Sequence, residues 1–494
     1  MAPREITLET ISSMFECTLS FRMAVLAFSI RITTTITTQR NMNAKRTYFQ
    51  YIAAAVVLSV CLLDAFSAPA ESQGFSKAAD LTSFEKPRWL TDLSLGVRES
   101  YDDNLYQAGT NLPLPASFTV PPGSVAARKV SSFVTTLSPK IGVDLAPLLG
   151  DQKTLQKFSL VYAPDFAFYH EQPTESHSAH HFTTTIDGKW SSVSFSADSV
   201  LTFINGSREG PTYPGGFLNA YSTSVPRDRR EQLNDRAVVV LQYDHGKWFI
   251  RPTGSLLYYD MMTKFFDVTG YQNYVDRYDV NGGADLGYRF MPQLAVTLGY
   301  RYGHQYQEQL PFSPFSSTSD YQRVLFGIEG KPWNWLEVKL QGGPDFRNYE
   351  KDAPVNKRLE TYYGEARLTA TLTTKDTLSF VYNGFQFVSQ LGQIPYFDST
   401  YKLSYHRKMS DQLTLDLDGS ILSSNYLKGN LPSSERLDLE YVFSARLGYS
   451  FNAHISAYLA YEFDAGRNGL AGVDDPNTRS FNRSLISIAV DCHY

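Results

Sequence analysis

The sequence predicts an all-β chain: a transmembrane antiparallel up-and-down β-barrel of about 18 strands, preceded by an N-terminal signal peptide. Three observations predict this fold. Hydrophobic and polar residues alternate with a period of two from Trp89 to the last residue. Short polar turns alternate with long connections rich in Gly, Pro, Ser and Asn. The chain ends on an alternating segment that stops at an aromatic residue.

The composition agrees with a membrane barrel and argues against a nucleic-acid partner. Hydrophobic residues make up 43 % of the 494 residues and aromatic residues 14 %. The mean hydropathy is nevertheless −0.27, so polar residues are distributed throughout the chain. Abundant aromatics suit the two girdles that mark membrane interfaces, although other all-β proteins share this feature. The net charge is −5 and no basic stripe is present, which excludes the usual electrostatic footprint of a nucleic-acid binder.

Residues 42–70 have the three parts of a secretory signal peptide. Lys45 and Arg46 form a basic start, and an apolar run of residues 51–63 follows. Small residues then lead to a cleavage site before Glu71. The apolar run is too short to span a bilayer comfortably, which favours cleavage over a retained anchor.

The signal peptide divides the chain into four segments. Residues 1–41 form an upstream extension without a barrel pattern, for which a misassigned start is the plain explanation. Residues 71–88 are expected to form a periplasmic lead-in, and residues 89–494 the barrel. Lipidation at Cys61 stays a lesser alternative, because the preceding residue is the bulky Val60. After cleavage, Cys492 alone remains of the three cysteines, and no intrachain disulfide can form.

Each predicted strand is a segment in which residues two apart share a face. The stretch 437–451 is the longest example, and its length exceeds that of ordinary soluble strands. The segments near His181 and Arg236 are the weakest. The predicted starts lie near Trp89, Val130, Lys157, His181, Ser192, Arg236, Trp248, Tyr278, Gln293, Tyr321, Leu336, Thr361, Thr377, Ser399, Leu413, Arg436, Ile455 and Arg479.

The connections between these segments are predicted to alternate strictly between short and long. Residues 205–234 and 464–478 are the clearest long connections. Tight periplasmic turns and long outside loops are typical of bacterial barrels. Short turns are expected at residues 187–189, 244–247, 290–293, 331–334, 374–376, 409–411 and 452–454.

The last strand carries a candidate signal for assembly. Ile486, Ile488, Val490 and Tyr494 share one face with Ser484 and Cys492, and the chain stops on the aromatic Tyr494. This pattern resembles the terminal strand by which the outer-membrane barrel assembly machinery recognises its clients. We therefore expect that machinery and outer-membrane lipids, including lipopolysaccharide, as partners, and we leave the oligomeric state open.

In hydrocarbon every backbone amide needs an internal partner, so the strands must close into a barrel. A barrel of about 18 strands leaves an aqueous lumen, and side chains of the polar face would line it. Acidic residues outnumber basic residues among these inward candidates, and such a lumen would favour cations or neutral solutes over phosphate. The simpler interpretation of these charged residues is that opposite charges pair across neighbouring strands in a water-filled lumen. The candidate pore-lining residues are Arg289, Arg301, Lys339, Glu337, Arg367, Glu365, Asp416, Asp418, Asp438, Glu440, Arg446 and Glu462.

Other chemistry is weakly indicated. The sequence predicts His177, His180 and His181 in an outside loop beside His170, where solvated histidines are a better interpretation than a metal site. Asp102-Asp103-Asn104 and Asp474-Asp475 carry the oxygen ligands that calcium prefers, but acidic loop residues usually bind nothing. We find no cofactor motif and no nucleophile with a matched base, so the sequence predicts neither a cofactor nor an enzyme.

Two short motifs carry a family resemblance. The first strand runs into Tyr101-Asp102-Asp103-Asn104-Leu105-Tyr106, and the second contains Leu137-Ser138-Pro139. With the signal peptide and the repeated hairpins, the chain resembles the bacterial outer-membrane β-barrel porin family whose members open with a similar Asp-Asp-Asn segment. The resemblance implies an outer-membrane location and pore activity, and it implies no particular solute.

The sequence therefore favours a porin-like channel for small polar solutes. Some barrels of similar size belong to exopolysaccharide secretion systems, and an outer-membrane exit for a polysaccharide is the alternative. A further alternative is a barrel scaffold whose long loops, notably residues 205–234, bind ligands.

Overall fold

The structure is a computed structural model, and it describes the strands of the barrel and the residues next to them. Within the described residues, no helix is both long and apolar enough to cross a membrane. The described residues are 87–107, 129–149, 154–206, 231–262, 275–309, 316–350, 353, 355–388, 394–427, 437–468 and 480–494.

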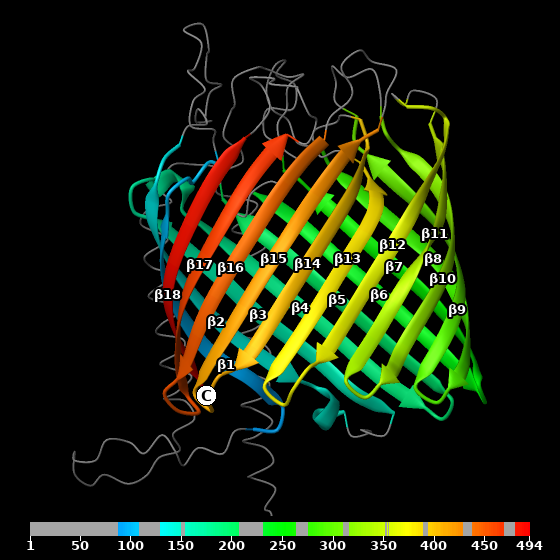
Figure 1. Ribbon diagram of the computed structural model, residues 1–494, viewed down its shortest axis with the longest axis horizontal. Helices are drawn as coiled ribbons and strands as arrows, with labels where there is room; N and C mark the ends of the chain where they lie inside the picture. Colours follow the sequence, from blue (N-terminus) through cyan, green and yellow to red (C-terminus); the bar gives the residue numbers. More distant parts are fainter. Residues whose placement is uncertain are drawn as a thin grey trace, which may run out of the picture. The chain divides into compact units, whose positions relative to one another are not determined.

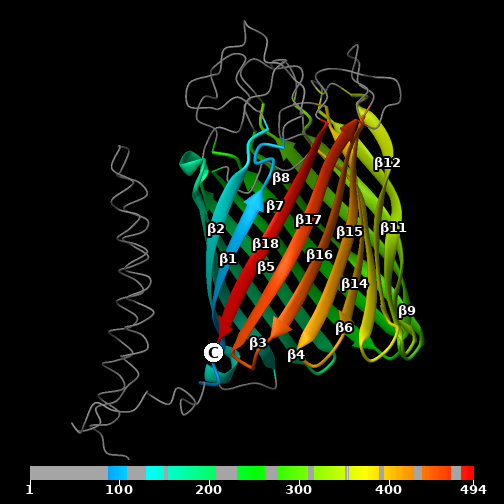
Figure 2. The same ribbon diagram turned by 60° about the vertical axis from the view of Figure 1, so that its left-hand side comes forward.

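Eighteen antiparallel strands form one closed sheet, as the sequence predicts (Figures 1 and 2). Each strand pairs with its sequence neighbours, and β18 pairs with β1 to close the barrel. The strands are β1 Leu90–Asp102, β2 Ser132–Asp144, β3 Leu155–Tyr169, β4 His177–Trp190, β5 Val193–Asn205, β6 Gln232–His245, β7 Trp248–Asp260, β8 Arg277–Met291, β9 Leu294–Gln307, β10 Ser319–Trp333, β11 Leu336–Tyr349, β12 Arg358–Thr371, β13 Asp376–Phe387, β14 Tyr396–Lys408, β15 Leu413–Tyr426, β16 Leu437–Ser450, β17 Ile455–Asn468 and β18 Phe481–His493. In the part of the chain that the structure describes, two single-turn 3-10 helices, η2 Ala146–Leu148 and η3 Pro173–Glu175, lie in connections.

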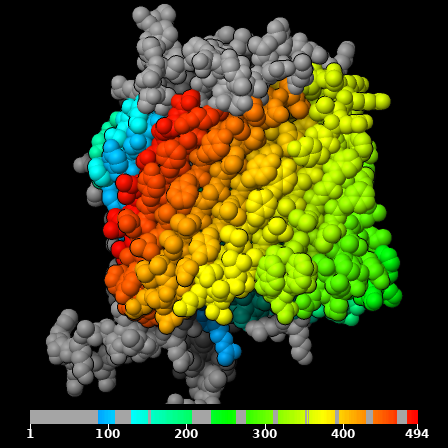
Figure 3. All heavy atoms as spheres, viewed as in Figure 1, coloured from blue at the N-terminus to red at the C-terminus, as the bar shows by residue number. Residues whose placement is uncertain are grey.

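Alternation gives the sheet two different faces. Large apolar side chains such as Ile488, Leu298 and Phe326 lie on the outward face and are 60, 49 and 62 % exposed in the isolated chain. Charged and amide side chains on the opposite face are often buried, among them Asp345 and Gln305. Because a closed sheet is concave on its inner side, only inward side chains can reach strands that are not their neighbours. Figure 3 shows the outward surface as diagonal bands, each following a tilted strand.

The barrel has two different rims. At the rim that we call the short-turn rim, β1 begins, β18 ends, and the backbone amide of Tyr494 donates to the carbonyl oxygen of Leu93 at 2.9 Å. The opposite rim, which we call the long-loop rim, carries the long connections. Tryptophan, unlike tyrosine and phenylalanine, is confined to the short-turn rim. All five tryptophans of the chain lie there, at Trp89, Trp190, Trp248, Trp333 and Trp335.

Several bounds of the connections differ from the expectation. Of the turn expected at residues 331–334, residues 331–333 lie inside β10, and residues 464–468 of the expected long connection lie inside β17. Residues 187–189 lie inside β4, and the turn comes later, at Ser191, whose φ of 53° is left-handed. Strict alternation of short and long connections also fails once. The short-turn connection at residues 145–154, which contains η2, is longer than the long-loop connection at residues 170–176. The reason is local: the Asp144 carboxylate accepts from the amides of Ala146 and Phe158 and thereby shapes a larger turn.

The histidine prediction was wrong in its location. His177, His180 and His181 lie in β4 and not in a loop. Because the strand alternates, His180 contacts Tyr162 on the outward face, whereas His181 is 3.6 Å from the inward Asp165. Few large apolar residues mark this strand, which explains why its first residues resemble a loop in the sequence.

Several expectations lie outside the described residues. They are the extension 1–41, the signal peptide 42–70 with its cleavage site, most of the lead-in 71–88, and Asp474-Asp475. The domain boundaries at these positions stay predictions.

Candidate functional site

The inner face of the barrel is the candidate functional site, because polar and charged side chains concentrate there. The strand register assigns side chains to this face: Lys339, for example, is paired with Glu329 on one side and Arg367 on the other. The same register places every predicted pore-lining residue on this inner face. They are Arg289, Arg301, Lys339, Glu337, Arg367, Glu365, Asp416, Asp418, Asp438, Glu440, Arg446 and Glu462. Outward, Ile486, Ile488 and Val490 of the candidate assembly signal are 52, 60 and 43 % exposed.

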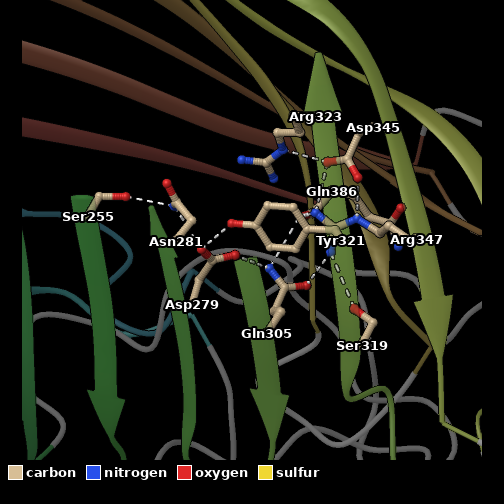
Figure 4. A network of polar contacts seen from close by, with 10 residues as sticks. All are labelled: Ser255, Asp279, Asn281, Gln305, Ser319, Tyr321, Arg323, Asp345, Arg347 and Gln386. Carbon is tan, nitrogen blue, oxygen red and sulfur yellow. Dashed lines mark hydrogen bonds and ion pairs between the residues drawn. The ribbon is translucent and has the colours of Figure 1, made fainter. Parts of the chain in front are cut away.

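A buried hydrogen-bond network crosses β8, β9 and β10 near the long-loop rim (Figure 4). The Tyr321 hydroxyl donates to Asp279 Oδ1 at 2.7 Å, and Gln305 Nε2 donates to Asp279 Oδ2 at 2.8 Å. Arg347 Nη1 on β11 donates to Gln305 Oε1 at 3.0 Å. Gly303 makes room for the Tyr321 ring, because an added Cβ there would overlap the ring atoms. The Asp279 carboxylate is thus held by two donors on two other strands.

Asp345 joins two arginines to this network. Arg323 Nε donates to Asp345 Oδ2 at 2.7 Å, and Arg347 Nη2 donates to the same oxygen at 3.1 Å. The guanidinium groups stack on Tyr321, with carbon-to-centroid distances of 4.1 Å for Arg323 and 4.6 Å for Arg347. The side chains of Asp345 and Arg347 are fully buried. A buried charge needs such partners, since breaking one pair leaves an uncompensated ion.

The end of β13 folds inward onto these arginines. We call Gln386, Phe387 and Val388 the β13 tip. Arg347 Nη2 donates to the Gln386 carbonyl oxygen at 3.2 Å, and Arg277 Nη1 donates to the Val388 carbonyl oxygen at 2.9 Å. The Arg277 guanidinium also stacks on the Phe387 ring at 4.6 Å. Since β13 is not a neighbour of β8 or β11, these contacts are made inside the lumen.

An apolar cluster accompanies the β13 tip inside the barrel. Tyr259 of β7 meets Phe387 with ring centroids 6.4 Å apart, so the cluster spans from β7 to strands well beyond β13. It narrows the lumen near the long-loop rim on the side of β7–β15. Its buried members are Tyr349, Val355, Phe387, Ile394, Tyr396 and Tyr426.

Ion pairs line the inner face closer to the short-turn rim. Arg251 of β7 binds Glu329 of β10 with two hydrogen bonds, which reach across two intervening strands. Arg289 binds Asp244 at 2.6 Å, and the guanidinium groups of Arg251 and Arg289 both lie 4.8 Å from the centroid of Phe249. In addition, Arg301 Nη2 lies 2.8 Å from Asp285 Oδ1 and Lys339 Nζ lies 3.0 Å from Glu365 Oε1.

Some carboxylates on the inner face of β14–β17 are accessible to solvent. Lys402 Nζ lies 3.1 Å from Asp418 Oδ1, and His406 Nδ1 lies 2.6 Å from Asp416 Oδ1. The Asp418 and Asp416 side chains are 34 and 37 % exposed, unlike the buried Asp345. The Arg446 guanidinium lies over the Tyr458 ring at 3.9 Å. Half-exposed carboxylates on an inner face indicate that solvent reaches this part of the lumen.

The Asp-Asp-Asn segment, residues 102–104, connects the end of β1 to the start of β18 by hydrogen bonds. Asp102 accepts from Arg483 Nη2 at 2.8 Å, and Asp103 accepts from the Ser484 amide at 2.6 Å. Asn104 Nδ2 donates to the Asn482 carbonyl oxygen at 2.9 Å. These carboxylates are therefore engaged by protein donors. Among the described residues, no group of three or more acidic, histidine or cysteine side chains could hold a metal ion.

Three acidic residues, Asp260, Asp276 and Glu308, lie close together at the long-loop rim. The Asp276 amide donates to Glu308 Oε2 at 3.1 Å, and the Glu308 amide donates to the Asp276 carbonyl oxygen at 2.8 Å. Burial raises the pKa of Glu308, and the nearby charges of Asp276 and Asp260 raise it further.

Sequence reasoning missed the centre of the buried network. Arg277, Arg323 and Arg347 are absent from the predicted pore-lining set, although they have the inward parity of their strands. The alternation of β10 and β11 could have identified Arg323 and Arg347. No sequence signal links Arg277 to the β13 tip, because that contact joins distant parts of the chain.

No protein-family model matches this chain, and no curated protein matches it. Solved structures do resemble its fold. OccK3 (OpdO) of Pseudomonas aeruginosa is 10 % identical, with a TM-score of 0.38 over 82 % of this chain and 95 % of that one. OccAB2 of Acinetobacter baumannii is 12 % identical, with a TM-score of 0.39 over 82 % and 98 %. The siderophore receptor PirA of the same organism is 8 % identical, with a TM-score of 0.38 over 82 % and 81 %. These likenesses concern the barrel fold and identify no solute.

Proposed function

We propose that this chain is an outer-membrane channel for small polar solutes. The observation that carries the proposal is the half-exposed charge on the inner face of a closed barrel, at Asp416, Asp418 and Glu462. A barrel filled by its own side chains would bury such groups, whereas barrels of 16 to 18 strands leave an aqueous lumen. The function needs no catalytic step and no cofactor.

An outer-membrane location is supported by the outward face. Strands of 12 to 15 residues, tilted as in known barrels, suit the apolar thickness of a bilayer. The tryptophans at the short-turn rim suit an interface. Near the long-loop rim, outward polar pairs such as His304 with Asp320, 2.8 Å apart, suit the depth of lipid headgroups. Lipopolysaccharide and the assembly machinery thus stay our proposed partners.

The β13 tip favours a second candidate, a conduit that is closed at rest. Its contacts with Arg277 and Arg347 narrow the lumen on one side. An exit for a secreted polysaccharide would need such closure until its partners engage, whereas a porin conducts alone.

Single-channel recording separates the two candidates. The refolded chain of residues 71–494 would be reconstituted in a planar bilayer, and retarded gel migration before heating would verify the folded barrel. Stable open steps support the channel for small solutes. A folded, inserted barrel that stays silent contradicts it and supports the conduit that is closed at rest.

A further inference from the structure

We infer that the wall of this barrel has a lateral opening between β12 and β13, through which the alkyl chain of an amphiphile passes between the outer leaflet of the membrane and the lumen. The inference goes beyond the proposed channel for polar solutes, because it concerns a route through the wall and not along the barrel axis. We call residues 358–363 of β12 and residues 385–387 of β13, which lie side by side at the long-loop rim, the lateral seam.

The ladder between β12 and β13 ends early at the long-loop rim. Its last pair there is Gly364 with Gly384, although β12 begins at Arg358 and β13 continues to Phe387. In the other seven hairpins that a short turn joins, the ladder reaches to within two residues of the strand ends at this rim. Residues 358–363 therefore have no ladder partner on the side of β13 within the strands that the structure describes.

Two aromatic side chains, from β12 and β14, meet over the lateral seam on the outward face. The rings of Tyr362 and Phe397 have centroids 4.2 Å apart, although β13 lies between their strands. By contrast, the outward rings of Tyr101 and Phe133 belong to directly paired residues of β1 and β2. On a convex surface, rings can meet across an intervening strand only where that strand recedes. The end of β13 thus bends toward the lumen, and Tyr362 and Phe397, which we call the lid, close the seam from outside.

Gln386 of the lateral seam is buried next to the lid. It is the ladder partner of Phe397, yet its side chain is fully buried, unlike most outward side chains. Its amide nitrogen and oxygen have no hydrogen-bond partner among the described residues. A buried amide without a partner is costly, and water can satisfy it once the lid opens. The closed seam therefore carries a cost that opening relieves.

The lateral seam reaches the depth of the lipid chains. Gly364 is six residues along β12 from Ala370, which pairs with Leu336 beside Trp335 at the short-turn rim. At about 3.3 Å per residue and a tilt of roughly 40°, the last ladder pair lies about 15 Å above that interface, inside an apolar band about 25 Å tall. Hydrocarbon does not tolerate an uncovered strand edge, which explains why aromatic rings cover this one.

The inner side of the lateral seam is apolar, whereas much of the inner face is charged. Phe387 is a buried member of the apolar cluster described above, and Leu359 and Phe385 pack against that cluster. An alkyl chain that passes the seam exchanges contacts with lipid for contacts with these side chains, and no apolar surface has to enter water. A charged solute would lose its hydration on this route and gain no partner. The ligand class that fits is an amphiphile with a flexible alkyl chain.

The test is photolabelling of the full barrel, residues 71–494, in vesicles of a phosphatidylcholine that carries a diazirine in the middle of one acyl chain. Because this probe stays in the membrane, it reaches inward residues only through the wall. Phe397→Ala and Tyr362→Ala each remove one ring of the lid. Phe133→Ala is the matched control, because it removes one ring of an outward pair, 5.0 Å apart, over a ladder that continues to the end of β1. Retarded gel migration verifies that each variant folds, and mass spectrometry identifies the labelled residues.

Labelling of Leu359, Phe385 and Phe387 should rise about fivefold in either lid variant, which corresponds to the loss of one aromatic contact of about 1 kcal/mol. Phe133→Ala should leave this labelling at the level of the parent barrel. Val200, an inward residue of β5 that is 43 % exposed, should stay unlabelled throughout. Inner labelling that is no higher in the lid variants than in Phe133→Ala, or that is equally strong at Val200, overturns the inference.

Discussion

Replacing Arg277 with alanine should release the β13 tip and widen the lumen. Arg277 Nη1 donates to the Val388 carbonyl oxygen at 2.9 Å. Its guanidinium carbon lies 4.6 Å from the centroid of Phe387 and 4.7 Å from that of Tyr259. The side chain thus links β7, β8 and the β13 tip, and it is 3 % exposed.

The size of the effect follows from these contacts. A hydrogen bond from a charged donor contributes about 1.5–3 kcal/mol to the attached state. Each buried cation–π contact adds about 1–2 kcal/mol. Loss of the hydrogen bond and one stacking contact therefore weakens attachment by roughly 3 kcal/mol, which changes the ratio of attached to released tip about 100-fold.

Single-channel conductance measures the outcome. Arg277→Ala should show larger or additional open levels than the parent barrel. Arg446→Ala is the matched control, since it also removes a lumen arginine stacked on a tyrosine but does not touch the β13 tip. Unchanged conductance in folded Arg277→Ala, or the same change in Arg446→Ala, would refute the role of the β13 tip as a constriction.

Two further predictions concern stability, and both can be measured by urea unfolding of the barrel in detergent micelles, followed by tryptophan fluorescence. Asp102→Ala should cost about 3–5 kcal/mol, because it leaves the Arg483 charge without its closest partner at the β1–β18 junction. Asp92→Ala is the control, because it removes a more exposed carboxylate of the same strand, and it should lower the free energy of unfolding by less than about 1 kcal/mol. Equal losses of stability in the two variants would contradict the role of Asp102 in attaching β1 to β18. For Glu308 the raised pKa means that the folded barrel holds the proton more tightly than the unfolded chain, so stability is lost as pH rises through the raised pKa. Glu308→Gln should therefore be more stable than the parent at neutral pH and lose this advantage below the ordinary glutamate pKa of about 4.3, and a constant difference across pH would contradict the assignment.

Much of the fold could be predicted from the sequence, because the alternation that marks a membrane strand involves only residues that are close together in the sequence. The period of two assigns each side chain to a face, and the predicted starts at Trp248, Leu336, Leu413 and Ile455 coincide with the first residues of β7, β11, β15 and β17. Closure followed from the requirement that every backbone amide in hydrocarbon have a partner. The exception was β4, where three histidines and few large apolar residues hide the alternation.

The inner network could not be predicted in the same way. Alternation places Arg251 and Glu329 on the inner face, but only the curvature of the closed sheet brings these side chains from β7 and β10 into contact. The contacts of the β13 tip were even harder to predict from the sequence. Its partners Arg277 and Arg347 lie far from Gln386 in sequence, and the hydrogen bonds go to backbone carbonyl oxygens, which every residue has. No residue pattern in β13 marks these contacts.

The central claim is that the lumen of this barrel is open to small polar solutes. The most direct measurement is the swelling of proteoliposomes that contain the folded barrel, after transfer into an isosmotic solution of a small neutral sugar. An open lumen predicts rapid swelling that scales with the amount of inserted barrel and slows as the sugar becomes larger. Swelling no faster than that of protein-free liposomes, with the barrel shown to be folded and inserted, would contradict the claim.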